Sequence, residues 1–476
     1  MAKITLDPVT RIEGHLKVEV EIDGNNTVTA AHSSGNLFRG FEAILKGRDP
    51  RDAVHITQRI CGLCPVSHSI AAVKAAEEAF GFTPSKNAVL MRSLILGGNY
   101  ISDHILHFYH LAIQDYVQLP QQSPWTPGYN SDFRFTQAES DALVANYLKA
   151  LEMRRKAHEM TALFSGKIPH VMSITAGGVT QQPNTENISK FRTYLNEIQA
   201  FVNNEYMDDL NVLASKYSDY YSIGGTVQNL LTYGVFDTNT SGGKLFNAGV
   251  SRNGSSETLN LDKIKEYVGY SHYSNTSGLN PADGETIPDY TKSGSYSWLK
   301  APRYNNDVFE VGPLARMIVN GYYDGGISVM DRHVARGLET QMLTENMQSW
   351  LSQLVPGSSS YTQLQLPTSG TGIGLTEAPR GALGHWLDFS GSTIDNYQVV
   401  TPTCWNVSPR DDMDQPGALE QALVGVKVAN PDQPIELLRV IHSFDPCTGC
   451  SVHIIDAEKR VKSQFVVSTP NPAGIC

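Results

Sequence analysis

The chain has 476 residues, of which 41% are hydrophobic and 18% charged, and it carries a formal net charge of −11. This composition fits a folded protein with a large core. The acidic balance excludes nucleic acid as a principal partner, because phosphate binding requires a basic surface. No apolar run approaches the roughly 18 residues that span a bilayer, and residues 1–7 hold no hydrophobic stretch of the signal-peptide type. Six cysteines in so long a chain do not form a disulfide framework.

The first half of the chain predicts one hairpin followed by long helices. Residues 14–35 alternate between apolar and polar around a turn at 23–26, which predicts a β-hairpin. Helical patterns follow at 38–46, 69–80, 86–119, 136–165 and 188–217. Because several long apolar helix faces are most simply buried against one another, we expect a helix bundle over residues 86–217.

The second half is more mixed. Residues 218–304 are rich in Ser, Gly, Asn, Thr and Tyr, which predicts an irregular or short-stranded excursion over the surface rather than an independent domain. Helical patterns return at 311–321, 330–355, 411–424 and 437–442, and residues 386–400 indicate a hairpin or small sheet. The predicted class is therefore α+β and predominantly helical, with a central long-helix bundle and small peripheral sheets.

Two short stretches near opposite ends of the chain carry most of the cysteines. Residues 59–68 read Arg-Ile-Cys-Gly-Leu-Cys-Pro-Val-Ser-His, and residues 445–453 read Asp-Pro-Cys-Thr-Gly-Cys-Ser-Val-His. Together the two Cys-x-x-Cys turns predict one four-thiolate metal site. The wide separation of the pairs disfavours a zinc knuckle, and a redox dithiol needs only one pair. Structural zinc, an iron–sulfur cluster, a catalytic metal and redox chemistry all remain open at this point. Gly62 and Gly449 are expected to permit close backbone approach.

Several other polar residues stand out. Asp103 lies in an apolar helical pattern, and a buried carboxylate requires donors or a cation. His104, His107 and His110 recur every third residue and so drift around the helix, which favours packing over metal binding. From composition alone, Glu13 is expected to be an ordinary surface carboxylate.

Taken together, these segments resemble the large subunit of nickel–iron hydrogenases. The resemblance spans the chain and also includes the segments 11–15, 39–42, 47–52, 104–110, 377–383 and 405–411. The related respiratory complex I subunit shares the fold but lacks the cysteines. The motifs are similar to those of periplasmic uptake and nickel–iron–selenium types, although Cys447 stands where the latter have selenocysteine. The resemblance implies the hydrogenase large-subunit fold, in a single catalytic unit over residues 1–453.

The resemblance also implies the metal ligands. Cys61 and Cys447 would bind nickel terminally, while Cys64 and Cys450 would bridge nickel to an iron that carries cyanide and carbon monoxide. Soft thiolates suit such a site.

Further ligands and contacts around the centre are implied in the same way. His68 would donate a hydrogen bond to a bridging sulfur, and Thr403 would donate one to an iron-bound cyanide. A magnesium ion would be held by Glu42, His453 and the backbone carbonyl of Val399.

The implied reaction is the reversible heterolytic cleavage of hydrogen into protons and electrons. Arg380, Asp103, Pro379 and Asp445 would form a canopy over the bound hydrogen. Either the Arg380 guanidine or a thiolate would accept the proton, and Glu13 would take it onward from the Cys447 sulfur. A hydrogen sensor that uses the same site is the alternative.

The resemblance implies partners as well. Only Cys404 and Cys476 remain outside the motifs, so the electrons would pass to a small subunit that carries iron–sulfur clusters. Export would depend on that subunit's signal, which gives a periplasmic or membrane-associated protein; a cytoplasmic location is the alternative. Residues 454–476 would be a maturation peptide, removed by an endopeptidase so that His453 becomes the C-terminus.

Overall fold

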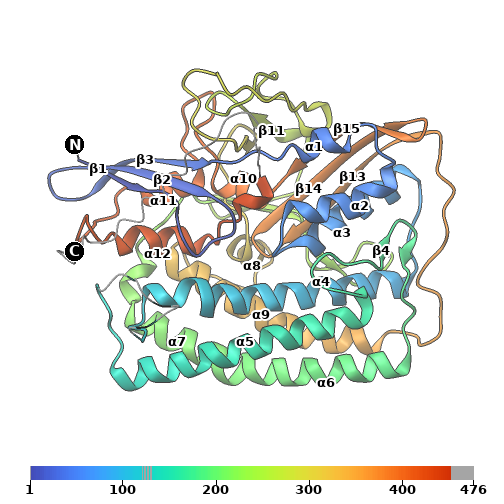
Figure 1. Cartoon of the computed structure of the whole chain (residues 1–476), viewed down its shortest axis with the longest axis horizontal. Coiled ribbons are helices and arrows are strands. Elements are labelled where there is room, and N and C mark those ends of the chain that lie inside the picture. Colours follow the sequence, from blue (N-terminus) through green and yellow to red (C-terminus); the bar gives the residue numbers. More distant parts are fainter. Residues whose placement is uncertain (1, 121, 123–124, 126–127, 129–130, 452–476) are drawn as a thin grey trace, which may run out of the picture.

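A computed structural model describes residues 2–120, 122, 125, 128 and 131–451 of the chain (Figure 1). Long helices form a layer that occupies the lower half of Figure 1, and small sheets with shorter helices lie above it. The long helices are α4 (Lys86–Leu106), α5 (Gln137–Ser165), α6 (Thr185–Phe201), α7 (Met207–Lys216) and α9 (Val329–Ser352). No helix among the described residues is long and apolar enough to cross a membrane.

Helix α4 is the centre of this layer. Every residue from Asn87 to Ile105 is buried, because α5 and α9 pack against it on different sides and the sheets cover it from above. The 86–119 pattern is not one regular helix: α4 passes into a π-helix, η3 (His107–Ala112), and a 3-10 turn, η4 (Ile113–Asp115). Helix α9 also packs on α6 and α7, so the bundle gains a member from beyond residue 217.

The strands form small antiparallel sheets. The hairpin predicted over residues 14–35 is present as two paired strands, and a third strand at the N-terminus extends it, in the order β1-β2-β3. A second sheet has the order β13-β14-β15. The bounds are β1 (Ala2–Leu6), β2 (Leu16–Ile22), β3 (Val28–Gly35), β13 (Ser369–Ala378), β14 (Gly381–Ser390) and β15 (Thr393–Val400).

Residues 218–304 contain short strands, short 3-10 helices and turns. The strands are β6 (Asn229–Thr232), β7 (Val235–Asp237), β8 (Lys244–Phe246), β9 (Gly249–Arg252), β10 (Ser255–Glu257), β11 (Ile264–Tyr267) and β12 (Ala301–Tyr304). A further two-stranded pair joins β4 (Ile174–Thr175) to β5 (Gly178–Val179). Trp298 and Tyr273 are buried and pack together with Phe38, so part of the excursion is tied to the rest of the chain.

The shorter helices are α1 (Phe41–Leu45), α2 (Ala53–Ile56), α3 (Pro65–Ala79), α8 (Pro313–Val319), α10 (Pro402–Asn406), α11 (Ala418–Leu423) and α12 (Ile435–Ser443). The helix predicted over residues 411–424 is wrong in its first half. The Asp411 carboxylate there accepts backbone N–H bonds from Met413 at 2.9 Å and Gln415 at 3.0 Å. Such side-chain acceptors stabilise a turn in competition with a helix.

Strand β13 and helix α3 fit together through small residues. Gly370, Gly372 and Gly374 alternate along β13 and share one face. An ideal Cβ on Gly374 would lie 1.8 Å from the Ala71 carbonyl oxygen, and one on Gly372 would lie 2.1 Å from the Ala75 carbonyl oxygen. A helix advances about 6 Å in four residues and a strand about 6.7 Å in two. Every second residue of β13 therefore meets every fourth residue of α3 along the contact.

We expect Gly374→Ala to destabilise the protein by about 1–3 kcal/mol or more, because the added methyl group meets a helix backbone that cannot yield. The measurement is the urea midpoint of unfolding. Gly24→Ala is the matched control, since a Cβ at Gly24 has nothing within 4 Å. Equal midpoints for the two variants would contradict this account of the α3–β13 contact.

Candidate metal centre

Three buried cysteine thiols converge from the two ends of the chain. The Sγ atoms of Cys61 and Cys447 are 3.1 Å apart, which is longer than a disulfide bond of about 2.05 Å. The Cys64 sulfur joins them, so that all three lie within 4.8 Å of one another. Among the described residues, no other group of three or more His, Cys, Asp or Glu side chains is arranged in this way. Cys450 belongs to the 3-10 turn η9 (Thr448–Ser451); its side chain and His453 lie outside the described part of the structure.

The first cysteine pair is positioned by the start of α3. Cys64 is the N-cap residue of this helix and Pro65 occupies its first turn, where proline is tolerated because its missing N–H would have no partner in the helix. The Cys61 sulfur accepts backbone N–H bonds from Leu63 at 3.3 Å and from Cys64 at 3.2 Å. These bonds stabilise negative charge on the sulfur, as a thiolate ligand requires.

The second pair is held beside the N-terminal segment. Residues Glu13 and Cys447 form a parallel β-bridge, and the backbone N–H of Thr448 donates to the Glu13 carbonyl oxygen at 2.8 Å. An ideal Cβ on Gly449 would lie 2.0 Å from the Glu13 carboxylate, so close approach at Gly449 is confirmed. Gly62 has nothing within 4 Å of that position, and the same expectation there is wrong.

Glu13 is not a solvated surface carboxylate. Its Oε2 accepts a hydrogen bond from the Cys447 thiol at 3.1 Å and one from the Gly449 backbone N–H at 2.7 Å. Burial raises the pKa of Glu13, and negative charge on Cys61 raises it further. Glu13 is half-buried. Its carboxyl group therefore lies between the buried Cys447 sulfur and the more accessible side of the N-terminal segment.

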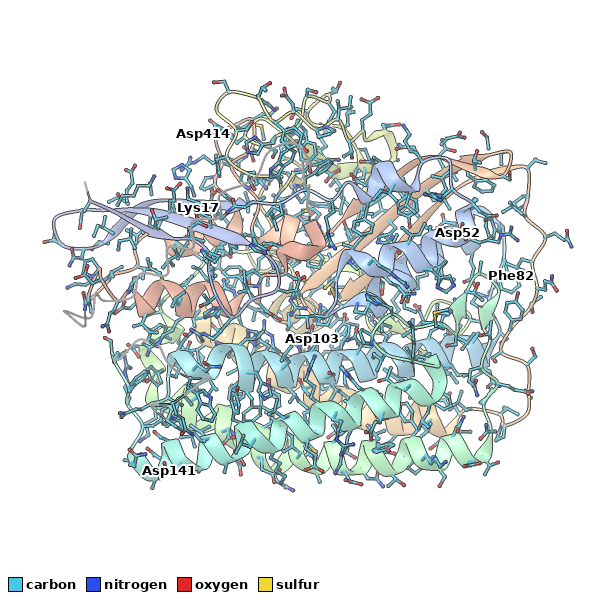
Figure 2. The ribbon with its side chains drawn as sticks, in the orientation of Figure 1. Lys17, Asp52, Phe82, Asp103, Asp141 and Asp414 are labelled. Carbon is cyan, nitrogen blue, oxygen red and sulfur yellow. The ribbon has the colours of Figure 1, made fainter. Side chains whose placement is uncertain are left out.

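A buried guanidinium lies between two carboxylates. Pro379 and Arg380 form the turn between β13 and β14, where Ala378 pairs with Gly381. Arg380 Nη1 donates to Asp103 at 2.7 Å, and its Nη2 donates to Asp445 at 3.0 Å. Figure 2 shows Asp103 on the central helix of the layer, inside the molecule. Burial alone would lower the pKa of Arg380, but Asp103 and Asp445 raise it well above its usual value. Asp103 therefore has the cationic partner that its apolar helix requires.

A second buried arginine holds the hairpin turn. Arg316 donates from Nη2 to the Pro379 carbonyl oxygen at 2.8 Å and also pairs with Glu339 and Glu377. His104 contacts the same Glu339 carboxylate at 2.8 Å. Sequence analysis did not single out Arg316, because nothing in its local pattern distinguishes a buried arginine from an exposed one.

The other two histidines of the 104–110 segment also contact protein groups. The His107 Nε2 lies 2.7 Å from the His442 carbonyl oxygen, and the His110 Nε2 lies 3.2 Å from the Tyr147 carbonyl oxygen. All three side chains are buried, as expected for histidines that pack in the core.

Helix α12 leads into the second motif and is anchored to the end of η4. The His442 Nδ1 lies 2.5 Å from the Asp115 carboxylate, which also pairs with Arg11. Burial alone would raise the pKa of Asp115, but Arg11 and His442 lower it to about 2. The anchor thus joins α12 to the N-terminal segment that carries Glu13.

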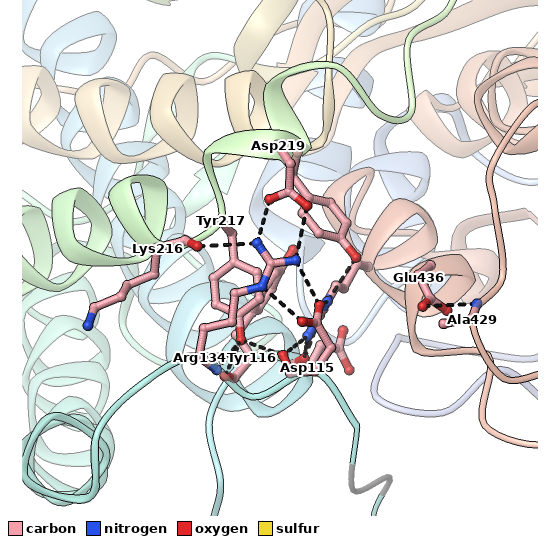
Figure 3. Close-up of polar contacts among 11 residues, drawn as sticks. Asp115, Tyr116, Arg134, Lys216, Tyr217, Asp219, Ala429 and Glu436 are labelled. Carbon is pink, nitrogen blue, oxygen red and sulfur yellow. Dashed lines mark hydrogen bonds and ion pairs between the residues drawn. The ribbon is translucent and has the colours of Figure 1, made fainter.

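An arginine–tyrosine cluster surrounds this anchor (Figure 3). Arg439 of α12 lies over the rings of Tyr116, Tyr217 and Tyr220. Beside it, Arg134 donates to the Asp219 carboxylate at 2.6 Å. Stacking of a desolvated guanidinium on aromatic rings stabilises by about 2 kcal/mol, which keeps α12 in register with the helical layer.

Two further residues were assigned from the resemblance, and one of them contacts a motif cysteine. The Thr403 hydroxyl accepts the backbone N–H of Cys447 at 3.1 Å. His68 lies one helical turn beyond Cys64 on α3. Its Nδ1 contacts the Nε2 of His385 at 3.1 Å, and its own Nε2 has no hydrogen-bond partner among the described residues.

Glu42 and Val399 lie next to each other. The Val399 backbone N–H donates to the Glu42 carboxylate at 2.9 Å, and the Thr286 hydroxyl donates to its other oxygen. Both residues line a cavity of about 60 Å³ that Glu266 and Lys300 also line. Neither Glu266 nor Lys300 could be singled out from the sequence, since both lie within the irregular 218–304 region.

Comparison with known proteins identifies the family. The family model described as nickel-dependent hydrogenase matches residues 39–122, 113–326 and 323–453, and a HoxL-like model matches residues 3–34. The chain belongs to the nickel-dependent hydrogenase large-subunit family. This chain is 41% identical to the periplasmic [NiFeSe] hydrogenase large subunit of Desulfomicrobium baculatum, over 96% of each chain. It is 32% identical to the hydrogenase-2 large chain of Escherichia coli, over 96% of this chain and 98% of that one.

Solved structures agree with this assignment. The Ni-Fe-Se hydrogenase of D. vulgaris Hildenborough in the reduced state matches the fold with a TM-score of 0.93 and 43% identity, over 95% of this chain and 100% of that one. The expected family and the predominantly helical α+β hydrogenase large-subunit fold are therefore confirmed, and the chain is a nickel-dependent hydrogenase.

Proposed function

We propose that this hydrogenase cleaves molecular hydrogen heterolytically and reversibly at a nickel–iron centre held by Cys61, Cys64, Cys447 and Cys450. The observation that carries the proposal is the convergence of three buried thiols within 4.8 Å. Thiolate ligands suit nickel and other soft metals. When bound, the nickel and its iron, with cyanide and carbon monoxide ligands, would supply the Lewis acid that polarises hydrogen. The resemblance to nickel–iron hydrogenases supports the iron and its ligands.

The canopy positions the substrate and keeps water out. Arg380, held by Asp103 and Asp445, presents a fixed guanidinium beside the thiols, and Pro379 fixes the turn that bears it. Because two carboxylates keep Arg380 protonated, it is a poor proton acceptor. The Cys447 sulfur is the better one, since it lies 3.1 Å from the Glu13 carboxylate that receives the proton next.

The remaining assignments follow from the resemblance to nickel–iron hydrogenases. Thr403 would donate to a cyanide on the iron, and His68 would donate to a bridging sulfur. Glu42, the Val399 carbonyl and His453 would hold magnesium at the 60 Å³ cavity. The Glu42 carboxylate fits this role, because magnesium prefers oxygen ligands and keeps several waters.

The electrons would leave through a small subunit that carries iron–sulfur clusters. Among the described cysteines outside the motifs there is only Cys404, which is buried, so this chain offers no cluster relay of its own. Relatives named as large subunits and large chains support a partner. The name of the D. baculatum relative supports a periplasmic or membrane-associated location, reached through the partner's export signal, with a cytoplasmic one as the alternative.

Residues 1–453 would form one catalytic unit, and residues 454–476 would be a peptide that a maturation endopeptidase removes. The nickel-dependent hydrogenase match ends at residue 453, which supports this boundary. Intact-mass measurement of the active enzyme should give a large subunit that ends at His453. Active enzyme that retains the last 23 residues would refute the cleavage.

Metal analysis tests the centre directly. We expect nickel in the purified complex, together with infrared bands from iron-bound carbon monoxide and cyanide. Cys61→Ser should abolish nickel binding because it removes one thiolate, whereas Cys404→Ser, the matched control at a buried cysteine outside the motifs, should retain it. Zinc without nickel in the wild-type complex would contradict the proposal and favour a structural zinc site.

Glu13→Gln tests the proton route. The amide keeps the size of the carboxylate and can still accept the Gly449 N–H, but it is far less basic. We expect hydrogen oxidation to fall by about 10²-fold or more, the usual contribution of a positioned acid–base group, at unchanged nickel content. Glu19→Gln on β2 is the control and should keep full turnover. If Glu13→Gln turned over hydrogen as fast as Glu19→Gln, the proposed proton relay through Glu13 would be wrong.

A further inference from the structure

A row of three buried side chains leads away from the cysteine cluster. His68 of α3 contacts His385 of β14 at 3.1 Å through Nδ1 and Nε2, and the His385 Nδ1 contacts the Tyr397 hydroxyl of β15 at 2.7 Å. All three side chains are at most 1% exposed. They therefore have no access to bulk water, and each donor or acceptor in the row must be satisfied by its neighbours.

The row can be hydrogen-bonded in two directions. A neutral imidazole has one donor and one acceptor nitrogen, and only one proton fits between His68 and His385. If His68 donates through Nδ1, then His385 donates to the tyrosine oxygen. The Tyr397 O–H then has no acceptor among the described residues, and a bare His68 Nε2 lone pair is left inside the protein.

The opposite direction satisfies both contacts within the row and leaves only the outer nitrogen of His68 without a partner among the described residues. Tyr397 donates its hydroxyl proton to the His385 Nδ1, and the His385 Nε2–H donates to the His68 Nδ1. The proton of His68 is then on Nε2, the nitrogen that has no partner among the described residues. In the first direction the Tyr397 O–H is an unsatisfied buried donor, which costs about 1–3 kcal/mol. The second direction is therefore strongly preferred once an acceptor faces the His68 Nε2.

His68 shares a helix face with the first cysteine motif. His68 follows Cys64 by four residues on α3, which places both on one face of the helix. Burial lowers the pKa of His68 to about 4, and negative charge on Cys61 opposes this shift. The thiol cluster thus lies close enough to His68 for its charge to act on the ring.

We propose that Tyr397 and His385 are positioning residues that fix the tautomer of His68, so that its Nε2–H points toward the cysteine sulfurs. Their function depends on His68 acting on the centre described under the proposed function, but the tautomer itself is a property of the protein chain. A carboxylate or backbone carbonyl often orients a metal-site histidine in this way; here a histidine and a tyrosine hydroxyl do so.

The test compares variants of the full chain, labelled with ¹⁵N-histidine and purified without metal. Nitrogen-15 chemical shifts distinguish protonated from unprotonated ring nitrogens, and His68→Gln assigns the signals. We expect wild-type His68 to be protonated on Nε2. Tyr397→Phe should add a second set of His68 signals from the Nδ1-protonated form, because His385 loses the donor that fixes it. Tyr304→Phe, at another buried tyrosine, is the control and should leave the signals unchanged.

The His385 variants separate hydrogen bonding from packing. His385→Gln provides an amide N–H for His68 and a carbonyl oxygen for Tyr397, so it should preserve the Nε2-protonated form, whereas His385→Phe should lose it. In the assembled complex, Tyr397→Phe should shift the infrared carbon monoxide band, while Tyr304→Phe should not. Wild-type His68 protonated on Nδ1, or a tautomer unaffected by both Tyr397→Phe and His385→Phe, would overturn the inference. A complex without nickel would instead overturn the proposed function and leave the tautomer result standing.

Discussion

The ion pairs of Arg380 are the interaction on which the rest of the site depends. They join the central helix α4, the β13–β14 turn and the second cysteine motif at one buried point. Removing one partner of such a pair leaves an uncompensated buried charge, which costs about 3–5 kcal/mol. Surrounding contacts hold the partners of Arg380 in position. Arg316 donates to the Pro379 carbonyl oxygen, and α12 is anchored through His442 to Asp115.

The same logic explains the opposite side of the centre. The first cysteine pair belongs to the N-terminus of α3, and α3 is fixed by the glycine face of β13. That strand continues directly into the turn that bears Arg380. One hairpin therefore sets both the position of two cysteines and that of the guanidinium, so an error in its register would displace ligands and canopy together.

The features that could be predicted from the sequence are those that depend on neighbouring residues or on a recognisable motif. Long amphipathic helices such as α5 and the 14–35 hairpin follow from periodicity, and the cysteine pairs follow from their spacing. Strand β13 was missed because alternating glycines lower strand propensity, and their purpose is visible only when α3 lies against them. Likewise, Asp411 looked like the start of a helix until its contacts with the backbone and with Arg303 were known.

Side chains whose surroundings are assembled from distant segments were the hardest to assign. Composition places Glu13 at the surface, yet the chain folds it against Cys447. Arg316 and Lys300 are indistinguishable in sequence from exposed basic residues, and only the tertiary structure gives them carboxylate partners. The family resemblance located Glu13 and Arg380, but it was silent on the row of His385 and Tyr397.

The distance along the chain between the two cysteine motifs has a consequence for biosynthesis. Cys61 and Cys447 are 386 residues apart, and a ribosome adds about 5–20 residues per second. The first pair therefore leaves the ribosome about 20 seconds or more before its counterpart exists. During that interval two thiols stand as an incomplete chelate, open to whichever thiophilic ion is most abundant. The first pair alone cannot select among such ions, so correct loading depends on the second pair being in place when the metal arrives.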